Sequence, residues 1–170
     1  WDDVSSVFME MEVNGRKGPK FGEDIWIDLA SHPLSLALGF LPGYEIDWQS
    51  AHCEIAEREN RARFEMVGNG QRSVVEFVLR DIDEGVPVRR FGVNDFLVDW
   101  HGYADAEGIY RAKLVREGRE VLCNDFMHIL IEDFAKYICG DGGQVWVSGE
   151  QALNNLKYQI MLLQRAERPS

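Results

Sequence analysis

Residues 96–123 read FLVDWHGYADAEGIYRAKLVREGREVLC, and this stretch decides the fold class. Hydrophobic and polar side chains alternate along most of it, which is typical of strands that turn one face toward a core. Two short polar segments, 104–108 and 116–119, interrupt the alternation. Because short connections join antiparallel neighbours, the pattern predicts a three-stranded meander over Phe96–Tyr103, Ile109–Val115 and Glu120–Cys123.

The residues before this meander indicate further strands. The segments 25–29 and 34–38 read as two short strands separated by His32-Pro33. A two-residue period then continues from Gly43, and Asn69-Gly70 is a strong hairpin signal. Residues 73–79 are compatible with a strand, because of two adjacent valines, or with a helix that starts at a capping box. We favour the strand.

Helical spacing is found near both ends of the chain. Residues 1–11 carry apolar side chains at positions 4, 7, 8 and 11, and residues 124–138 carry a similar stripe after Asn124. Ser148 and Gln151 form a capping box ahead of a last helix. The predicted fold class is therefore α+β: an antiparallel, meander-rich sheet with an N-terminal helix and two C-terminal helices packed on it. We expect one domain over residues 1–170.

Composition excludes several classes of protein. The chain has 170 residues, with 18 Lys and Arg against 29 Asp and Glu, and a net charge of −11. This acidity argues against nucleic-acid binding. The longest apolar stretch, residues 34–43, is about half of the ~20 residues that a membrane span requires. Three scattered cysteines without CxxC spacing predict reduced thiols and a cytoplasmic location.

One polar cluster could support chemistry, at Asp99, His101, Asp105 and Glu107. These side chains could hold Mn²⁺ or Zn²⁺, or Asp99 could orient His101 as a general base. The spacing matches no established metal loop, so we predict no tightly bound ion and no cofactor. Cys123 is an alternative nucleophile if His101 reaches it across the sheet, although a buried inert thiol is the commoner case.

Acidic residues are concentrated at the start of the chain, where residues 1–60 hold 12 acids and 4 bases. Tyr44 and Trp48 share a segment there with Glu45 and Asp47, and aromatic side chains beside carboxylates suit a basic protein partner. We therefore predict a small acidic cytoplasmic inhibitor that neutralises a basic protein, such as a toxin or an enzyme. Its profile is similar to that of bacterial immunity proteins.

Two other functions are compatible with the sequence. The first is a small-molecule-binding or hydrolytic enzyme that uses a cavity with His101 and Asp99 or with Cys123. The second is an assembly subunit, which would carry a large exposed apolar patch. The sequence leaves the oligomeric state open.

Overall fold

The computed structural model describes residues 3–15 and 18–168, which form eight strands and four helices. This α+β composition, with a mostly antiparallel sheet, confirms the predicted class. The chain divides into two compact units, one of residues 1–98 and 155–170 and the other of residues 99–154. The single domain over residues 1–170 stays a prediction.

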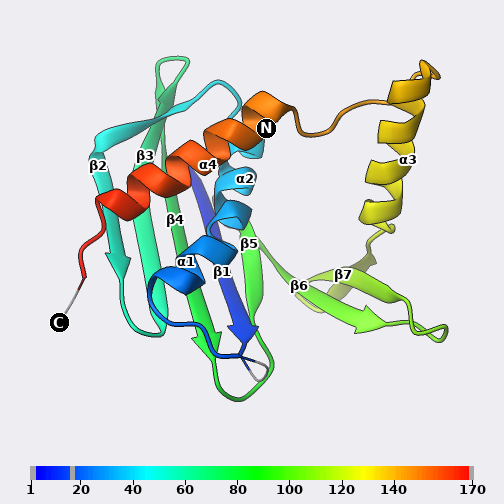
Figure 1. Cartoon of the computed structure of the whole chain (residues 1–170), viewed down its shortest axis with the longest axis horizontal. Helices are drawn as coiled ribbons and strands as arrows, with labels where there is room; N and C mark the ends of the chain where they lie inside the picture. Colours follow the sequence, from blue (N-terminus) through cyan, green and yellow to red (C-terminus); the bar gives the residue numbers. More distant parts are fainter. Residues whose placement is uncertain (1–2, 16–17, 169–170) are drawn as a thin grey trace. The chain divides into compact units, whose positions relative to one another are not determined.

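The first unit contains five of the eight strands of the sheet that the described residues form (Figure 1). Its strands are hydrogen-bonded in the order β2-β3-β4-β1-β5. β1 runs parallel to β4, whereas β1–β5, β2–β3 and β3–β4 are antiparallel. The strands are β1 (Ser6–Asn14), β2 (Glu45–Ile55), β3 (Glu59–Gly68), β4 (Gln71–Ile82) and β5 (Arg89–Val93). Parallel neighbours need a long crossover connection, and the segment that joins β1 to β4 is long enough to provide one.

Helices cover one face of this sheet and enclose the core (Figure 1). They are α1 (Glu23–Leu29), α2 (Ser31–Phe40) and, from Asn155 onward, α4 (Gly149–Gln164). Trp26 from α1 lies 5.6 Å from the ring of Phe77, and Phe77 lies 6.2 Å from the ring of Phe64. These large side chains are almost completely buried, and so is Leu162 of α4. Alternate residues of the strands therefore point into one apolar layer between sheet and helices.

The second unit contains the predicted meander. β6 (Phe96–Ala104) enters it at Asp99 and pairs antiparallel with β7 (Tyr110–Arg116), which pairs antiparallel with β8 (Arg119–Leu122). The meander is thus confirmed. It is followed by α3 (Phe126–Cys139), whose N-cap Asp125 accepts a hydrogen bond from the backbone N–H of His128.

The predicted N-terminal helix is wrong, because β1 occupies most of it. Trp1 and Asp2 lie outside the described residues. Two residues of the supposed helical stripe, Val7 and Met11, also fit a two-residue period, and both are buried on the helix-covered side of the sheet. Neighbours on both sides, β4 and β5, supply backbone hydrogen bonds, so tertiary pairing selects the strand.

The two strands predicted over residues 25–38 are wrong as well, because this stretch forms α1 and α2. Buried side chains recur at helical spacing within each helix: Ile25 and Leu29 are four residues apart in α1, and Leu34 and Ala37 are three apart in α2. Pro33 is tolerated since it lies in the first turn of α2, where a backbone N–H has no partner within the helix.

Other local predictions are confirmed. Residues 73–79 lie in the strand β4, and Asn69 and Gly70 connect β3 to β4 with φ of 51° and 75°. The Ser148–Gln151 capping box is present, with both hydrogen bonds formed. No helix in the described part of the chain is long and apolar enough to cross a membrane. The cytoplasmic location stays a prediction.

Candidate active site

A buried carboxylate, Asp81 at the end of β4, holds the loop that connects β1 to α1. Its Oδ1 accepts a hydrogen bond from the backbone N–H of Gly15 at 3.0 Å. Its Oδ2 accepts one from the backbone N–H of Lys20 at 2.6 Å. The Asp81 side chain is completely buried. The backbone is therefore fixed to the sheet at Gly15 and at Lys20. This fixes the position from which the Lys20 side chain extends.

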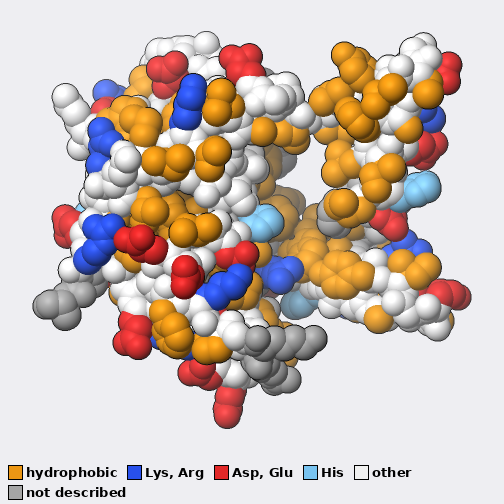
Figure 2. Space-filling model, in the orientation of Figure 1, with side chains coloured by type: hydrophobic (Ala, Val, Ile, Leu, Met, Phe, Trp, Pro, Cys, Tyr) orange, Lys and Arg blue, Asp and Glu red, His pale blue; other side chains and the backbone are white. Residues whose placement is uncertain are grey.

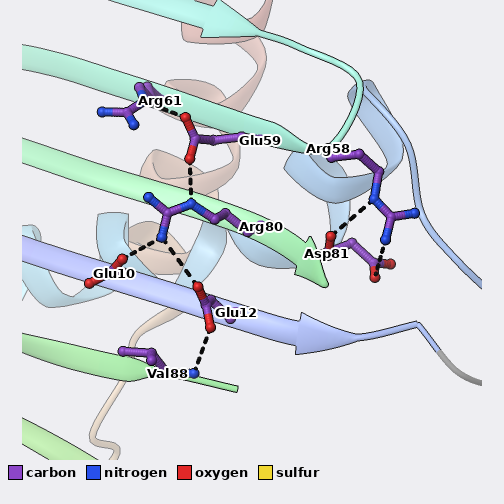
Figure 3. A network of polar contacts seen from close by, with 8 residues as sticks. All are labelled: Glu10, Glu12, Arg58, Glu59, Arg61, Arg80, Asp81 and Val88. Atoms are coloured by element: carbon purple, nitrogen blue, oxygen red, sulfur yellow. Dashed lines mark hydrogen bonds and ion pairs between the residues drawn. The ribbon is translucent and has the colours of Figure 1, made fainter. Parts of the chain in front are cut away.

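Gly15 is required by this close approach. A Cβ atom at residue 15 would lie 2.6 Å from both carboxylate oxygens of Asp81. Arg58 packs beside the same carboxylate: its Nε donates to the backbone oxygen of Asp81 at 3.1 Å, and one of its Nη atoms lies 3.7 Å from Asp81 Oδ1 (Figure 3). The buried charge is thus neutralised by a cation and by backbone dipoles.

A second buried polar side chain, Asn60 of β3, anchors the start of α1. Its Nδ2 donates to the backbone oxygen of Gly22 at 2.8 Å. The backbone N–H of Gly22 donates in turn to the backbone oxygen of Glu57 at 2.9 Å. The first turn of α1 is therefore tied to the β2–β3 connection, and the direction of α1 follows from the sheet.

Three polar side chains come together along α1 and α2. Lys20 forms an ion pair with Asp28 near the end of α1. His32 follows four residues after Asp28, in the first turn of α2. Residues four apart share a face of a helical segment, and the pKa of His32 responds to the charge of Asp28. Asp28 and His32 are both exposed, so this face is accessible to a ligand.

The environment of His32 lowers its pKa below the ordinary value of 6.5. The largest cause is that neighbouring protein atoms partly desolvate the imidazole, and the positive charge of Arg89, at the start of β5, acts in the same direction. The carboxylate of Asp28 opposes them and raises the pKa. Because the net effect favours the uncharged imidazole, His32 can accept a proton near neutral pH.

The opposite face of the sheet carries a separate set of charges, centred on Arg80 of β4 (Figure 3). Arg80 forms ion pairs with Glu10, Glu12 and Glu59, from the strands on both sides of β4. Alternation places Arg80 on the other side of the strand from Asp81. This network belongs to the sheet face without helices and is not part of the site around His32.

The sequence-predicted cluster in the second unit lies along β6 and the turn that follows it. His101 is exposed and lies opposite Lys113 in the sheet, while Asp99 lies opposite Val115. The Asp105 carboxylate accepts hydrogen bonds from the backbone of Glu107 and Ile109 and from Arg111. Across the described residues, no group of three or more His, Cys, Asp or Glu is arranged to hold a metal. Asp105 instead shapes the turn between β6 and β7.

Cys123 does not face His101. Lys113 lies between His101 on β6 and Leu122 on β8, and directly opposite residues point to the same side of a sheet. Cys123 is one residue past Leu122, so alternation turns it to the other side. The thiol is partly buried, and its backbone N–H donates to the oxygen of Ala112 at 2.9 Å.

The predicted partner-binding residues make contacts within the chain. Trp48 packs edge-on against Tyr158 at 5.8 Å, and the guanidinium of Arg165 lies 4.8 Å from its ring. Asp47 pairs with Arg72 at 2.9 Å. The Tyr44 hydroxyl is 2.9 Å from Gln71 Oε1, while Glu45 is exposed. A protein partner on this strand stays a prediction.

Sequence reasoning missed Lys20, Asp28, His32 and Arg89. A usable signal was present, since Asp28 and His32 are four residues apart within a stretch whose apolar positions also recur every three to four residues. Reading that stretch as two strands placed the pair on different elements. Arg89 and Lys20 carry no such signal, because only the folded sheet brings them to this end of the helices.

The fold has counterparts among solved structures. One is UDP-N-acetylglucosamine 3-dehydrogenase GnnA from Acidithiobacillus ferrooxidans, with TM-score 0.63 and 19% identity over 96% of this chain and 55% of that chain. Another is KijD10, a 3-ketoreductase from Actinomadura kijaniata solved with TDP-benzene and NADP, with TM-score 0.53 and 14% identity over 98% of this chain and 54% of that chain. The chain shares its fold with these oxidoreductases. It spans about half of their length.

These likenesses correct the predicted function. The structural neighbours are oxidoreductases, so the acidic inhibitor with an immunity-protein profile is wrong. Charge and aromatic content describe a surface and do not define the fold beneath it, which is why the profile misled. No family model and no curated protein sequence matches the chain.

The residues of this chain do not fit the NADP of the 3-ketoreductase structure. A dinucleotide is held by free backbone N–H groups where a glycine-rich loop enters a helix. The glycine-containing loop between β1 and α1 has this position, but the N–H groups of Gly15, Lys20 and Gly22 already donate to protein oxygens. The buried carboxylate of Asp81 would also repel a phosphate there.

Proposed function

We propose that the chain forms the substrate-facing part of an oxidoreductase that interconverts a secondary hydroxyl and a ketone on a sugar-like substrate. The Asp28–His32 pair on α1 and α2 carries this proposal, because it offers a proton-accepting imidazole on an accessible helix face. The likeness to a 3-dehydrogenase and a 3-ketoreductase supports the reaction class.

Oxidation of an alcohol to a ketone removes a hydride from carbon and a proton from the hydroxyl oxygen. In the proposed reaction, uncharged His32 accepts the hydroxyl proton, and the imidazolium that results is stabilised by the nearby carboxylate of Asp28. In the reverse direction His32 returns the proton to the ketone oxygen. The hydride would pass to a nicotinamide dinucleotide, like the NADP of the 3-ketoreductase structure, bound by residues other than those of the loop between β1 and α1.

Lys20 and Asp81 act as positioning residues in this proposal. Lys20 neutralises Asp28 in part and fixes the carboxylate near the end of α1. Asp81 accepts a hydrogen bond from the backbone of Lys20, so it acts on the substrate only indirectly, through Lys20. The negative charge of Asp28 is close both to Lys20 and to the positive charge that His32 gains on protonation. Because these groups are already in place, proton transfer needs little rearrangement.

The test is a titration of the chain with UDP-N-acetylglucosamine, followed by NMR of the histidine side chains. We expect the His32 resonances to shift and the shift to be weakened by Asp28→Asn. His32→Gln should reduce binding, whereas His128→Gln on the exposed polar side of α3 should not. Binding that leaves His32 unperturbed, or that survives His32→Gln unchanged, contradicts the proposal.

A further inference from the structure

Helix α3 exposes a long apolar stripe. Its members recur at intervals of three and four residues and are each 37–67% exposed. We call this set the α3 patch, and it consists of Met127, Leu130, Ile131, Phe134, Tyr137 and Ile138. Figure 2 shows hydrophobic side chains gathered along this helix. Among the described side chains of α3, none is buried. An amphipathic helix normally buries such a stripe.

Little within the second unit stabilises this helix. Of the apolar side chains described in residues 99–154, only Ala112 is buried. One side of α3 is held by the following loop, where Trp146 Nε1 donates to Asp133 Oδ2 at 2.7 Å. Isolated helices of about 14 residues are marginal in water. The α3 patch therefore requires a covering surface.

The size of the patch fits a protein–protein contact. From their exposed fractions, the six side chains leave roughly 700 Å² accessible, a sum that uses full side-chain areas of about 200 Å². Ile109 and Tyr110, which line a pocket of about 240 Å³ together with Met127, extend the apolar surface. A standard interface buries about 800 Å² per partner.

The chemistry of the patch favours a second copy of this chain as the occupant. The 3-4 spacing of its members is that of a helix–helix seam, and none of the six is charged. The charged residues of α3 lie outside the seam, where His128, Glu132 and Lys136 form i, i+4 pairs. When two copies are related by a two-fold axis, the α3 patch of one copy faces the α3 patch of the other. The two surfaces then have the same length and the same apolar character.

We propose that the α3 patch is the contact surface between two copies of this chain, packed helix against helix around a two-fold axis. The contact buries the seam and leaves the i, i+4 ion pairs in water. The pocket beside Met127 gives space for an aromatic side chain of the second copy. This inference does not depend on the proposed oxidoreductase function, since none of its residues belongs to the site around His32.

Sedimentation equilibrium of the full chain in reducing buffer tests the proposal, with reductant present because Cys139 is exposed. The wild-type chain should reach twice its mass of 19.5 kDa. Ile131→Glu and Phe134→Glu each place two like charges in the seam and should weaken the dimer at least about 10-fold. The matched control is Val86→Glu, since Val86 is 82% exposed in the first unit. It should leave the dimer intact.

A wild-type chain that remains monomeric overturns the proposal. A dimer that the patch variants do not weaken also overturns it. Far-UV circular dichroism shows whether a variant keeps its helices. If a glutamate variant does not, Ile138→Ser decides, because Ile138 is 67% exposed and serine adds no charge.

Discussion

The pKa of His32 depends on opposing influences that can be separated by substitution. Burial and the charge of Arg89 lower it, and the charge of Asp28 raises it. Asp28→Asn should therefore lower the pKa of His32 further, and Arg89→Gln should raise it. NMR titration of the His32 ring measures both shifts. Asp24→Asn, in the first turn of α1, is the control and should have little effect. Shifts of the same sign in the first two variants would contradict this account.

The same pKa affects stability. In the unfolded chain His32 titrates near its ordinary value of 6.5, and in the folded chain it titrates lower. The folded state therefore binds fewer protons between these two values, and the stability that depends on uncharged His32 is complete above 6.5. It decreases as the pH falls through the folded pKa. Urea unfolding at several pH values should show a shallower decrease for His32→Gln.

Asp81 is the residue whose loss should affect the site loop most. Asp81→Ala leaves the backbone N–H groups of Gly15 and Lys20 without their buried acceptor, and it removes one of the two carboxylates beside Arg58. We expect the free energy of unfolding to fall by about 2–4 kcal/mol. Asp83→Asn is the matched control, because Asp83 also pairs with Arg58 but its side chain is 81% exposed. Its effect should stay below about 1 kcal/mol. Equal losses in both variants would contradict the anchoring role.

At the scale of elements, α4 stabilises the first unit by placing a few side chains over the sheet. Leu162 is completely buried, whereas Leu156 on the same helix is 51% exposed. Leu162→Ala should lower the free energy of unfolding by about 2–5 kcal/mol, since it removes a packed side chain and leaves a cavity. Leu156→Ala should cost less than about 1 kcal/mol. Chemical denaturation measures both, and a similar cost for the two would show that α4 is not docked through Leu162.

At the scale of the whole molecule, the hydrophobic core lies entirely in the first unit. Every residue of the buried core cluster belongs to residues 1–98 or 155–170. We therefore expect that replacement of residues 99–154 by a flexible Gly/Ser linker leaves a chain that folds cooperatively. Its free energy of unfolding should stay within about 2 kcal/mol of the full chain, because few buried apolar contacts are removed. Loss of cooperative unfolding in this variant would show that both units form one domain.

The sequence by itself determined the meander of β6, β7 and β8, the hairpin at Asn69-Gly70, the capping box of α4 and the α+β class. Each depends on neighbours in sequence, through alternation, turn chemistry or a capping side chain. Only the tertiary structure decided that residues 6–14 form a strand and residues 23–40 form helices. The apolar residues of both stretches are compatible with a helix and with a strand. Pairing with β4 and β5 selects the strand for residues 6–14, and packing on the core selects the helices for residues 23–40. The candidate site shows the same division. Asp28 and His32 are four residues apart, so the sequence alone places them close together. Lys20, Asp81 and Arg89 join them only because strands distant in sequence meet at one end of the sheet.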